Sequence, residues 1–305
     1  MTTQTSAFPQ ALLRRVSVQA PYLALRNLEV LGAGWVAAEA PVEYPLGREV
    51  GPMSAAEAGR HLALVGSLAA ASLQADDRQH YYLARRASLR RKHPGGGAGT
   101  GPLRVVARAL LSRRSASAST VLKLASGRPV LELDVEYSVL SAKSFTRIFQ
   151  SRASAASSGD SRAAVPRLSR SDVRVVAGGH ASASFQVDAA DCSGHFEGFP
   201  AMPVAKLSHG FGLVAGELVA DLAASEDSCE ARYRIDRCTL SADLLPFAGD
   251  SLHLGMSYVG RRRSAERICG TATDQDGQAV DRFEADFVSL GARSVRELER
   301  LQRAV

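Results

Sequence analysis

The sequence predicts an α+β chain made of two copies of one unit, each a long buried helix wrapped by an antiparallel sheet. Two segments are long enough for helices and apolar nearly all round. Strand-like alternation follows each of them: Gly127–Leu140 (GRPVLELDVEYSVL) resembles Gly277–Leu290 (GQAVDRFEADFVSL), and Tyr82–Leu89 (YLARRASL) resembles Tyr233–Leu240 (YRIDRCTL). Because the order is kept and the shift is 150 or 151 positions, we infer an internal duplication.

The first repeat, residues 1–150, is predicted to begin its ordered part with a short strand over Trp35–Val42. The long helix follows over Ala55–Gln74, where Ala, Leu, Gly and Val predominate. Three or four antiparallel strands complete the repeat, interrupted by the glycine-rich loop His93–Pro102 (HPGGGAGTGP). Leu110–Ser115 (LLSRRS) marks a turn between two of these strands, and YVGRRRS is its counterpart in the second half.

Residues 151–172 are rich in Ser, Ala and Arg and have the composition of a linker. The second repeat, residues 173–305, is predicted to repeat the plan: a strand over Ala181–Val187, a helix over Val204–Ala224, and three or four strands. Ser294–Val305 reads as a short charged amphipathic helix. A single buried helix wrapped by an antiparallel sheet is the hotdog unit, so the prediction is a tandem, or double, hotdog. Pairing the two sheets edge to edge would remove one exposed edge from each.

One segment carries recognisable chemistry. Gly194–Leu207 reads GHFEGFPAMPVAKL, in which His195 opens a loop directly before the second predicted helix. The segment resembles the G-H-F-P-G-x-P-x-M-P-G signature of the bacterial β-hydroxyacyl-acyl-carrier-protein dehydratases, which are hotdog enzymes. The resemblance is close over this segment and architectural elsewhere. It implies that the substrate is bound by Phe196, Gly198, Pro200, Met202, Pro203, Val204 and His209.

In the family that the motif resembles, the histidine removes the α-proton of a 3-hydroxyacyl thioester and a helix carboxylate of the partner subunit protonates the departing hydroxyl. The N-terminus of the buried helix polarises the thioester carbonyl. This sequence has Glu197 in place of the first proline and Val204 in place of the last glycine. His209 stands at the acid position, fourteen residues after His195.

In a fused pair, the missing acid is expected on the helix of the first repeat. Two alignments, with shifts of 151 and 148, place the acid position at Ala58, beside Glu57, or at His61. Glu57 and His61 are four residues apart and share one face of the helix, so both are candidates beside the catalytic His195. Glu57 is favoured, because a buried carboxyl with a raised pKa can donate a proton near neutral pH. The mirror-image site, with Tyr44 or Gly47 at the histidine position, is expected to be inactive.

These features predict a lyase that dehydrates, or in reverse hydrates, a 3-hydroxyacyl thioester in fatty-acid or polyketide biosynthesis. One alternative is a hotdog acyl-thioesterase in which a helix carboxylate activates water. Another is a non-catalytic acyl-binding or partner subunit. A condensing enzyme of the A-factor synthase type, which shares the fused architecture, ranks lower because its second-repeat motif differs.

Composition sets the remaining expectations. Hydrophobic residues make up 46% of the 305-residue chain and charged residues 22%, which is typical of a globular protein. The net charge of +6 favours an acidic partner, such as an acyl carrier protein, or a coenzyme A thioester. No nucleic-acid module, signal peptide, membrane span or Cys-x-x-Cys pair is present, so we expect a cytoplasmic chain with buried free thiols. We expect no metal and no cofactor beyond the phosphopantetheine that carries the substrate, in a homodimer or in a monomer acting as a pseudodimer.

Overall fold

The computed structural model describes residues 8–93, 101–154, 168–176, 178–224 and 231–290. Their helices are α1 (Phe8–Arg15), α2 (Ala55–Ala71), α3 (Ala142–Phe149) and α4 (Val204–Ala224). The strands of the first half are β1 (Arg26–Gly32), β2 (Trp35–Ala40), β3 (His80–Arg91), β4 (Leu103–Leu111), β5 (Ser115–Lys123) and β6 (Pro129–Ser141). Those of the second half are β7 (Arg174–Val176), β8 (His180–Gln186), β9 (Arg232–Ala242), β10 (Ser251–Arg262), β11 (Ala265–Thr273) and β12 (Ala279–Leu290).

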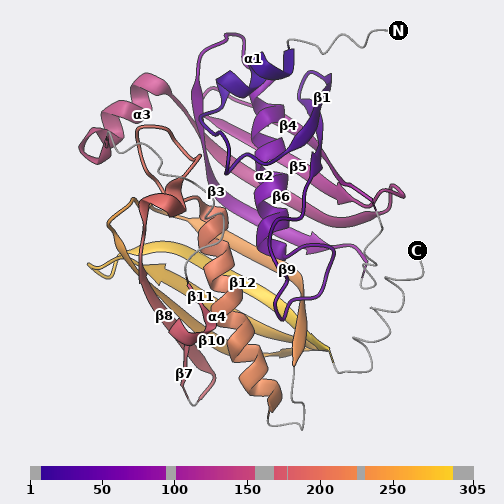
Figure 1. The fold of residues 1–305 in the computed structure, drawn as a ribbon, viewed down its shortest axis with the longest axis vertical. Helices are drawn as coiled ribbons and strands as arrows, with labels where there is room; N and C mark the ends of the chain where they lie inside the picture. The colour runs from indigo at the N-terminus through magenta and orange to yellow at the C-terminus, as the bar shows by residue number, and fades with distance from the viewer. Residues whose placement is uncertain (1–7, 94–100, 155–167, 177, 225–230, 291–305) are drawn as a thin grey trace.

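The strands form one sheet of twelve in the order β1-β2-β4-β5-β6-β3-β9-β12-β11-β10-β8-β7. Each half contributes six neighbouring strands, and the halves meet where β3 pairs antiparallel with β9. In Figure 1, α2 lies in front of the N-terminal, upper half of this sheet, and α4 lies in front of the C-terminal, lower half. The tandem hotdog predicted from the sequence is therefore confirmed, and the two units are joined edge to edge as expected.

Both long helices lie against the concave face of their own half of the sheet and are held by a tyrosine from it. The Tyr137 hydroxyl donates a hydrogen bond to the Ala63 carbonyl of α2 (2.6 Å), and the Tyr233 hydroxyl donates to the Gly212 carbonyl of α4 (3.2 Å). Glycine makes each approach feasible. A Cβ on Gly216 would lie 2.5 Å from the Tyr233 hydroxyl oxygen, well inside van der Waals contact.

The strand pattern follows the alternation in the sequence. Along β6 the side chains alternate between buried and more exposed positions, and the buried ones, including Leu133, Val135 and Tyr137, enter the main core. The β4–β5 turn and the β10–β11 turn fall where the related arginine-rich segments were found in the sequence.

Several elements differ from the expectation. The first strand ends at Ala40 rather than Val42, the first long helix ends at Ala71 rather than Gln74, and the second-half strand spans His180–Gln186 rather than Ala181–Val187. α1, α3, β1 and β7 were not predicted. α1 and α3 are short, with eight residues each, and β7 has three, so none carries a long hydrophobic period. The predicted helix Ser294–Val305 lies outside the described residues.

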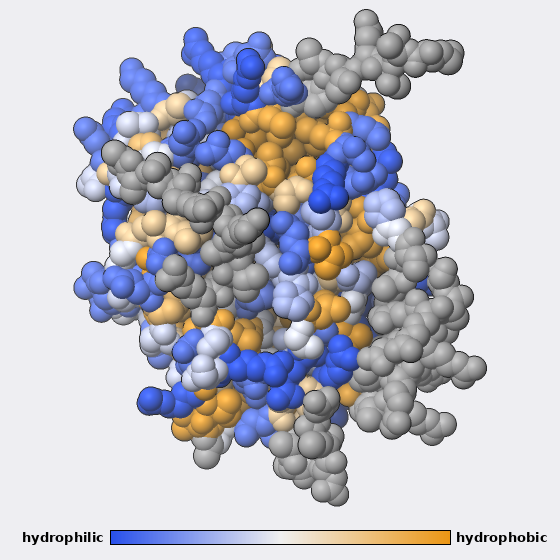
Figure 2. Space-filling model, viewed as in Figure 1, coloured by the Kyte–Doolittle hydropathy of each residue, from blue (hydrophilic) through white to orange (hydrophobic). Residues whose placement is uncertain are grey.

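Figure 2 shows the helix face of the molecule, on which the largest hydrophobic area lies in the upper, N-terminal half and hydrophilic residues are common around the rim. No helix in the described part of the chain is long and apolar enough to span a membrane. Cys192, Cys238 and Cys269 are free thiols, of which only Cys192 is fully buried.

Candidate functional site

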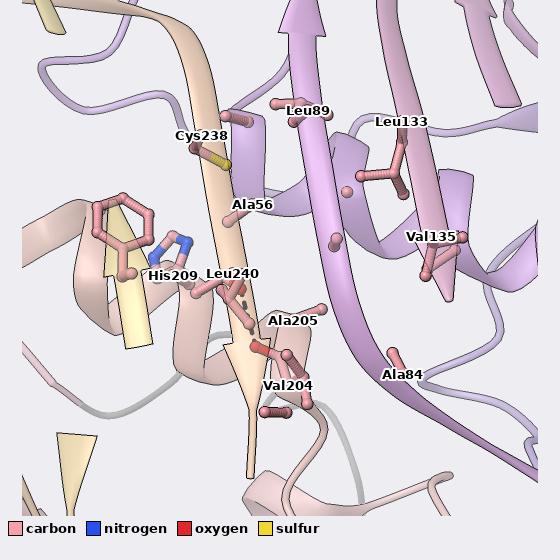
Figure 3. Close-up of a pocket in the computed structure, with 18 of the residues that line it drawn as sticks. Ala56, Ala84, Leu89, Leu133, Val135, Val204, Ala205, His209, Cys238 and Leu240 are labelled. Carbon is pink, nitrogen blue, oxygen red and sulfur yellow. Dashed lines mark hydrogen bonds between the residues drawn. The ribbon is translucent and has the colours of Figure 1, made fainter. Parts of the chain in front are cut away.

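A cavity of about 520 Å³ lies between the two long helices and the central strands of the sheet. Its wall is mostly aliphatic, with small residues on the helices and larger ones on the strands. In Figure 3 the helix side chains Ala56, Val204 and Ala205 face the same space as strand side chains including Leu89, Leu133, Val135 and Leu240. Such a slot suits an extended hydrocarbon chain, because burying apolar surface on both sides releases water from it.

His195 lines this cavity from the loop between β8 and α4. The loop is held by a strand-like segment near the N-terminus: Gln19 N donates to the Gly194 carbonyl (2.9 Å) and Phe196 N donates to the Ser17 carbonyl (3.0 Å). Gly194 has a φ of +76°, and a Cβ there would lie 2.4 Å from the Gln19 carbonyl oxygen. Phe196 has a φ of +58°, unusual for a bulky residue, so the packing around it must hold the loop in a strained form.

The His195 ring is fixed in one orientation by its surroundings. It stacks on the Phe196 ring at a centroid distance of 3.8 Å and meets the Tyr22 ring edge-on at 5.1 Å. Nδ1 lies 2.9 Å from the Ala201 carbonyl oxygen. Since a carbonyl can only accept, Nδ1 carries the hydrogen and Nε2 keeps its lone pair. Burial, assisted by the charge of Lys206, lowers the pKa of His195 to about 4, so the ring is a neutral base at pH 7.

The first turn of α4 lines the same cavity through Val204 and Ala205. The amides of Val204 and Ala205 have no acceptor among the described residues, and Pro203 before them has no side-chain group that could cap the helix. Free N–H groups at a helix N-terminus attract developing negative charge.

The first turn of α2 is capped instead. Ser54 Oγ accepts from Glu57 N (3.2 Å), and Glu49 Oε1 accepts from Ala55 N (2.8 Å). The two helices therefore present different ends to one cavity: α2 has a carboxyl group against its first turn, and α4 has open donors.

Glu49 is a cavity-lining carboxyl that the sequence interpretation missed. It is 5% exposed, and burial raises its pKa to about 7 despite the nearby charge of Arg91. The backbone around it pairs with Tyr233 at the start of β9. No motif marks Glu49 in the sequence. The one available signal was a carboxylate shortly before a predicted helix N-terminus.

The cavity also settles the register of the two helices. The cavity-facing residues of α2 include Ala56, Gly59, Ala63 and Ser67, and those of α4 include Ala205, Ser208, Gly212 and Gly216, each 149 positions further on. Neither of the two alignments considered from sequence has this shift. The α2 counterpart of His209 is therefore Arg60.

Glu57 and His61 lie on another face of α2, against the chain that follows β2, and neither lines the cavity. Glu57 Oε1 accepts from Glu43 N (2.5 Å), and His61 Nε2 lies 3.1 Å from the Pro41 carbonyl oxygen. Burial raises the pKa of Glu57 to about 7 and lowers that of His61 to about 3. The structure thus has a carboxyl of the expected pKa on α2, but it does not bring that carboxyl together with His195.

Glu43, Glu57 and His61 also form a group whose potential ligand atoms lie within 4.8 Å of one another. The Arg60 guanidinium already contributes positive charge there: it pairs with Glu43 and lies 3.3 Å from His61 Nε2. It also donates to the Tyr44 hydroxyl (2.8 Å). We interpret the group as a buried polar network around Arg60.

The remaining motif residues divide into two sets. Phe196, Val204 and His209 line the cavity, and the His209 ring lies 5.9 Å from that of Tyr44. The other motif residues shape the loop without lining the cavity: Gly198 has a φ of +76°, Pro200 accepts from Ala248 N, Met202 N donates to Pro246, and the Pro203 carbonyl receives the first bonds of α4.

No protein-family model and no curated protein sequence matches the chain. Solved structures do resemble it. The TesB protein of Mycobacterium avium subspecies paratuberculosis has a TM-score of 0.53 at 12% identity, covering 93% of this chain and all of its own. The 12:0-ACP thioesterase of Umbellularia californica also has a TM-score of 0.53 at 12% identity, covering 84% of this chain and 95% of its own. The acyl-CoA thioesterase II TesB2 of Mycobacterium marinum has a TM-score of 0.50 at 13% identity, covering 87% and 96%. At these identities the likeness concerns the fold.

This comparison corrects the functional prediction. A 3-hydroxyacyl dehydratase, and with it a lyase of fatty-acid or polyketide biosynthesis, was expected from the histidine motif, yet the similar structures from Umbellularia californica and Mycobacterium marinum are named as thioesterases and none of the three is named as a dehydratase. The two residues of α2 that the sequence offered as the acid, Glu57 and His61, do not line the cavity with His195, whereas Glu49, from the segment before α2, does.

Proposed function

We propose that the protein is a hotdog acyl-thioesterase that hydrolyses the thioester of an acyl chain held in the cavity between α2 and α4. The observation that carries the proposal is the position of His195. A neutral imidazole with an unprotonated Nε2 lines the same apolar slot as Val204 and Ala205, whose amides have no acceptor among the described residues. The names of the solved thioesterases with this fold support the same class of reaction.

In the proposed reaction, water attacks the thioester carbonyl carbon while His195 Nε2 accepts one of its protons. The carbonyl oxygen becomes negative and receives hydrogen bonds from the first amides of α4. The tetrahedral intermediate then collapses, and the carbon–sulfur bond breaks. The leaving thiolate takes the proton from the imidazolium, so the products are a free thiol and a carboxylic acid.

The test is release of free thiol from an acyl-CoA, followed with a thiol-reactive chromophore. We expect His195→Ala to lower kcat by about 100-fold or more, because general-base catalysis contributes on that scale. His253→Gln is the matched control, since His253 is an exposed histidine bonded to Ser184 on the sheet and lies outside the cavity. Thiol release that is absent from the wild type, or unchanged in His195→Ala, would overturn the proposal. Binding of the acyl thioester without turnover would favour a non-catalytic acyl-binding subunit.

A further inference from the structure

The seam between the two hotdog units is open at one end. β3 and β9 pair only from Arg86 with Ser241 to Arg90 with Arg237. Before Arg86 on β3, and after Ser241 on β9, the two strands are no longer paired with each other. A register shift in the β3–β6 ladder leaves Arg85 as an extra residue at this point. The central strands therefore diverge, and Arg85 is placed at the start of the gap.

A surface groove of about 650 Å³ lies outside this gap. It shares part of its lining with the acyl cavity, namely Arg85, Tyr137, Ser138, Ala242 and Asp243. The groove and the cavity therefore adjoin at the divergence of β3 and β9. A long, thin molecule could place its apolar end in the cavity and its other end in the groove.

The chemistry of the groove differs from that of the cavity. Arg85 and Arg86 are exposed, and their side chains have no hydrogen-bond or ion-pair partner in the described part of the chain. Arg282 lies in the groove too, paired with Asp243 (2.6 Å). Hydroxyl groups are supplied by Ser112, Ser115, Ser117, Ser138 and Ser241.

The one other carboxylate of the groove, Glu136, stands beside Arg86 in the ladder but forms no ion pair with it. Two unpaired guanidinium groups therefore face one unpaired carboxylate. Guanidinium groups with hydroxyls around them are the donors that bind phosphate in proteins.

The opposite end of the seam is filled. Arg91 has a side chain that is 2% exposed, and its Nε donates to the Ile235 carbonyl (3.0 Å). The segment around Glu49 adds a bridge to Tyr233 at the same end. Among the described residues, the arginines that line the groove therefore lie at one end of the seam, so the two ends of the slot differ.

From this arrangement we propose that the groove binds the phosphate of a phosphopantetheine arm, with Arg85 and Arg86 as its ligands, while the acyl chain occupies the cavity. The inference rests on the proposed thioesterase function and names its substrate class: a thioester on phosphopantetheine. Coenzyme A and an acyl carrier protein both present that phosphate at the far end of the arm from the thioester, and the groove chemistry is common to both.

The experiment compares one acyl chain on three carriers: pantetheine, which has no phosphate, coenzyme A, and an acyl carrier protein. Wild type and the double variant Arg85→Gln/Arg86→Gln are assayed on each. Loss of two charge-assisted contacts should raise KM at least about 10-fold for the phosphate-bearing carriers and leave the pantetheine thioester unchanged. Arg237→Gln is the control, because Arg237 is an exposed arginine on β9, at the other end of the β3–β9 ladder, and does not line the groove.

The outcomes separate the two proposals. A rise in KM for the coenzyme A thioester, the carrier-protein thioester or both supports phosphate binding in the groove and identifies the source of the phosphate. Equal KM values for all carriers in the wild type, or an equal rise in KM for the pantetheine thioester in the double variant, would refute phosphate binding in the groove. Neither result would contradict the proposed thioesterase activity. If no thioester is cleaved, calorimetry with coenzyme A and with pantetheine still tests phosphate binding in the groove. The proposal then requires coenzyme A to bind the wild type more tightly than pantetheine does, and the double variant to bind both equally.

Discussion

Glu49 makes the stability of this fold depend on pH in a way that one substitution should remove. The carboxyl is buried, accepts a hydrogen bond from Ala55 N, and has a pKa raised from 4.5 to about 7. Between those two values the folded chain binds its proton more tightly than the unfolded chain does. The contribution of Glu49 to stability is therefore full below about pH 4.5, falls as the pH rises, and reaches its minimum above about pH 7.

A difference of about 2.5 between the two pKa values corresponds to about 3 kcal/mol, at 1.36 kcal/mol for each unit. Glu49→Gln keeps an oxygen acceptor for Ala55 N and has no proton to lose. We expect the variant to match the wild type near pH 4.5 and to be more stable by up to about 3 kcal/mol at pH 8.

Urea unfolding of both proteins at a series of pH values measures this difference. The comparison has to be made between the variant and the wild type, because buried His61 and His195, with lowered pKa values, change the total stability in the opposite direction as the pH rises. Glu197→Gln, which removes a carboxylate from an exposed site, is the control. A difference between Glu49→Gln and the wild type that stays constant from pH 4.5 to 8 would refute the reasoning.

Three further predictions concern the cavity and its walls. If His195 is the base, kcat/KM should rise with pH through about 4 and then stay level; a rise through about 7 would assign the base to Glu49 instead. Gly59→Leu should fill part of the cavity, because nothing lies within 4 Å of a Cβ at that position. Competition assays should then show a larger loss of kcat/KM for long acyl chains than for short ones. An equal loss would contradict the assigned position of the acyl chain. Gly216→Ala should lower the free energy of unfolding by about 1–3 kcal/mol, since its Cβ would clash with Tyr233. Gly212→Ala is the control, because a Cβ there meets nothing within 4 Å. Equal thermal unfolding midpoints for the two variants would show that the approach of Tyr233 to Gly216 is unimportant.

The sequence was sufficient for the fold because the two strongest signals were long. Each buried helix carries apolar residues on all sides, and the related strand pairs recur at a nearly constant shift, so the duplication and the architecture followed from them. The short elements α1, α3 and β7 have too few residues to show a period. Their placement depends on tertiary contacts, such as the stacking of Phe145 on Tyr81 at a centroid distance of 3.7 Å.

The site was predicted in part. His195, Phe196, Val204 and His209 do line one cavity, because the motif specifies a local loop before a helix. The expected acid could not be found from sequence, because a helix turns by about 100° for each residue and an alignment error of one or two positions moves a side chain to another face. The sequence alignments therefore placed Glu57 at the acid position, whereas its side chain faces the chain after β2. Glu49 was missed because its role depends on the pairing of its backbone with Tyr233, far away in the chain.

The unequal ends of α2 and α4 bear on what a fused chain can do that a pair of identical subunits cannot. In a symmetric dimer every substitution occurs twice, so a carboxyl placed against one helix terminus is placed against both. A single polypeptide is free of that constraint. One terminus, closed by Ser54 and Glu49, can secure the fold, while the other keeps the donors at Val204 and Ala205 unoccupied for a reacting carbonyl.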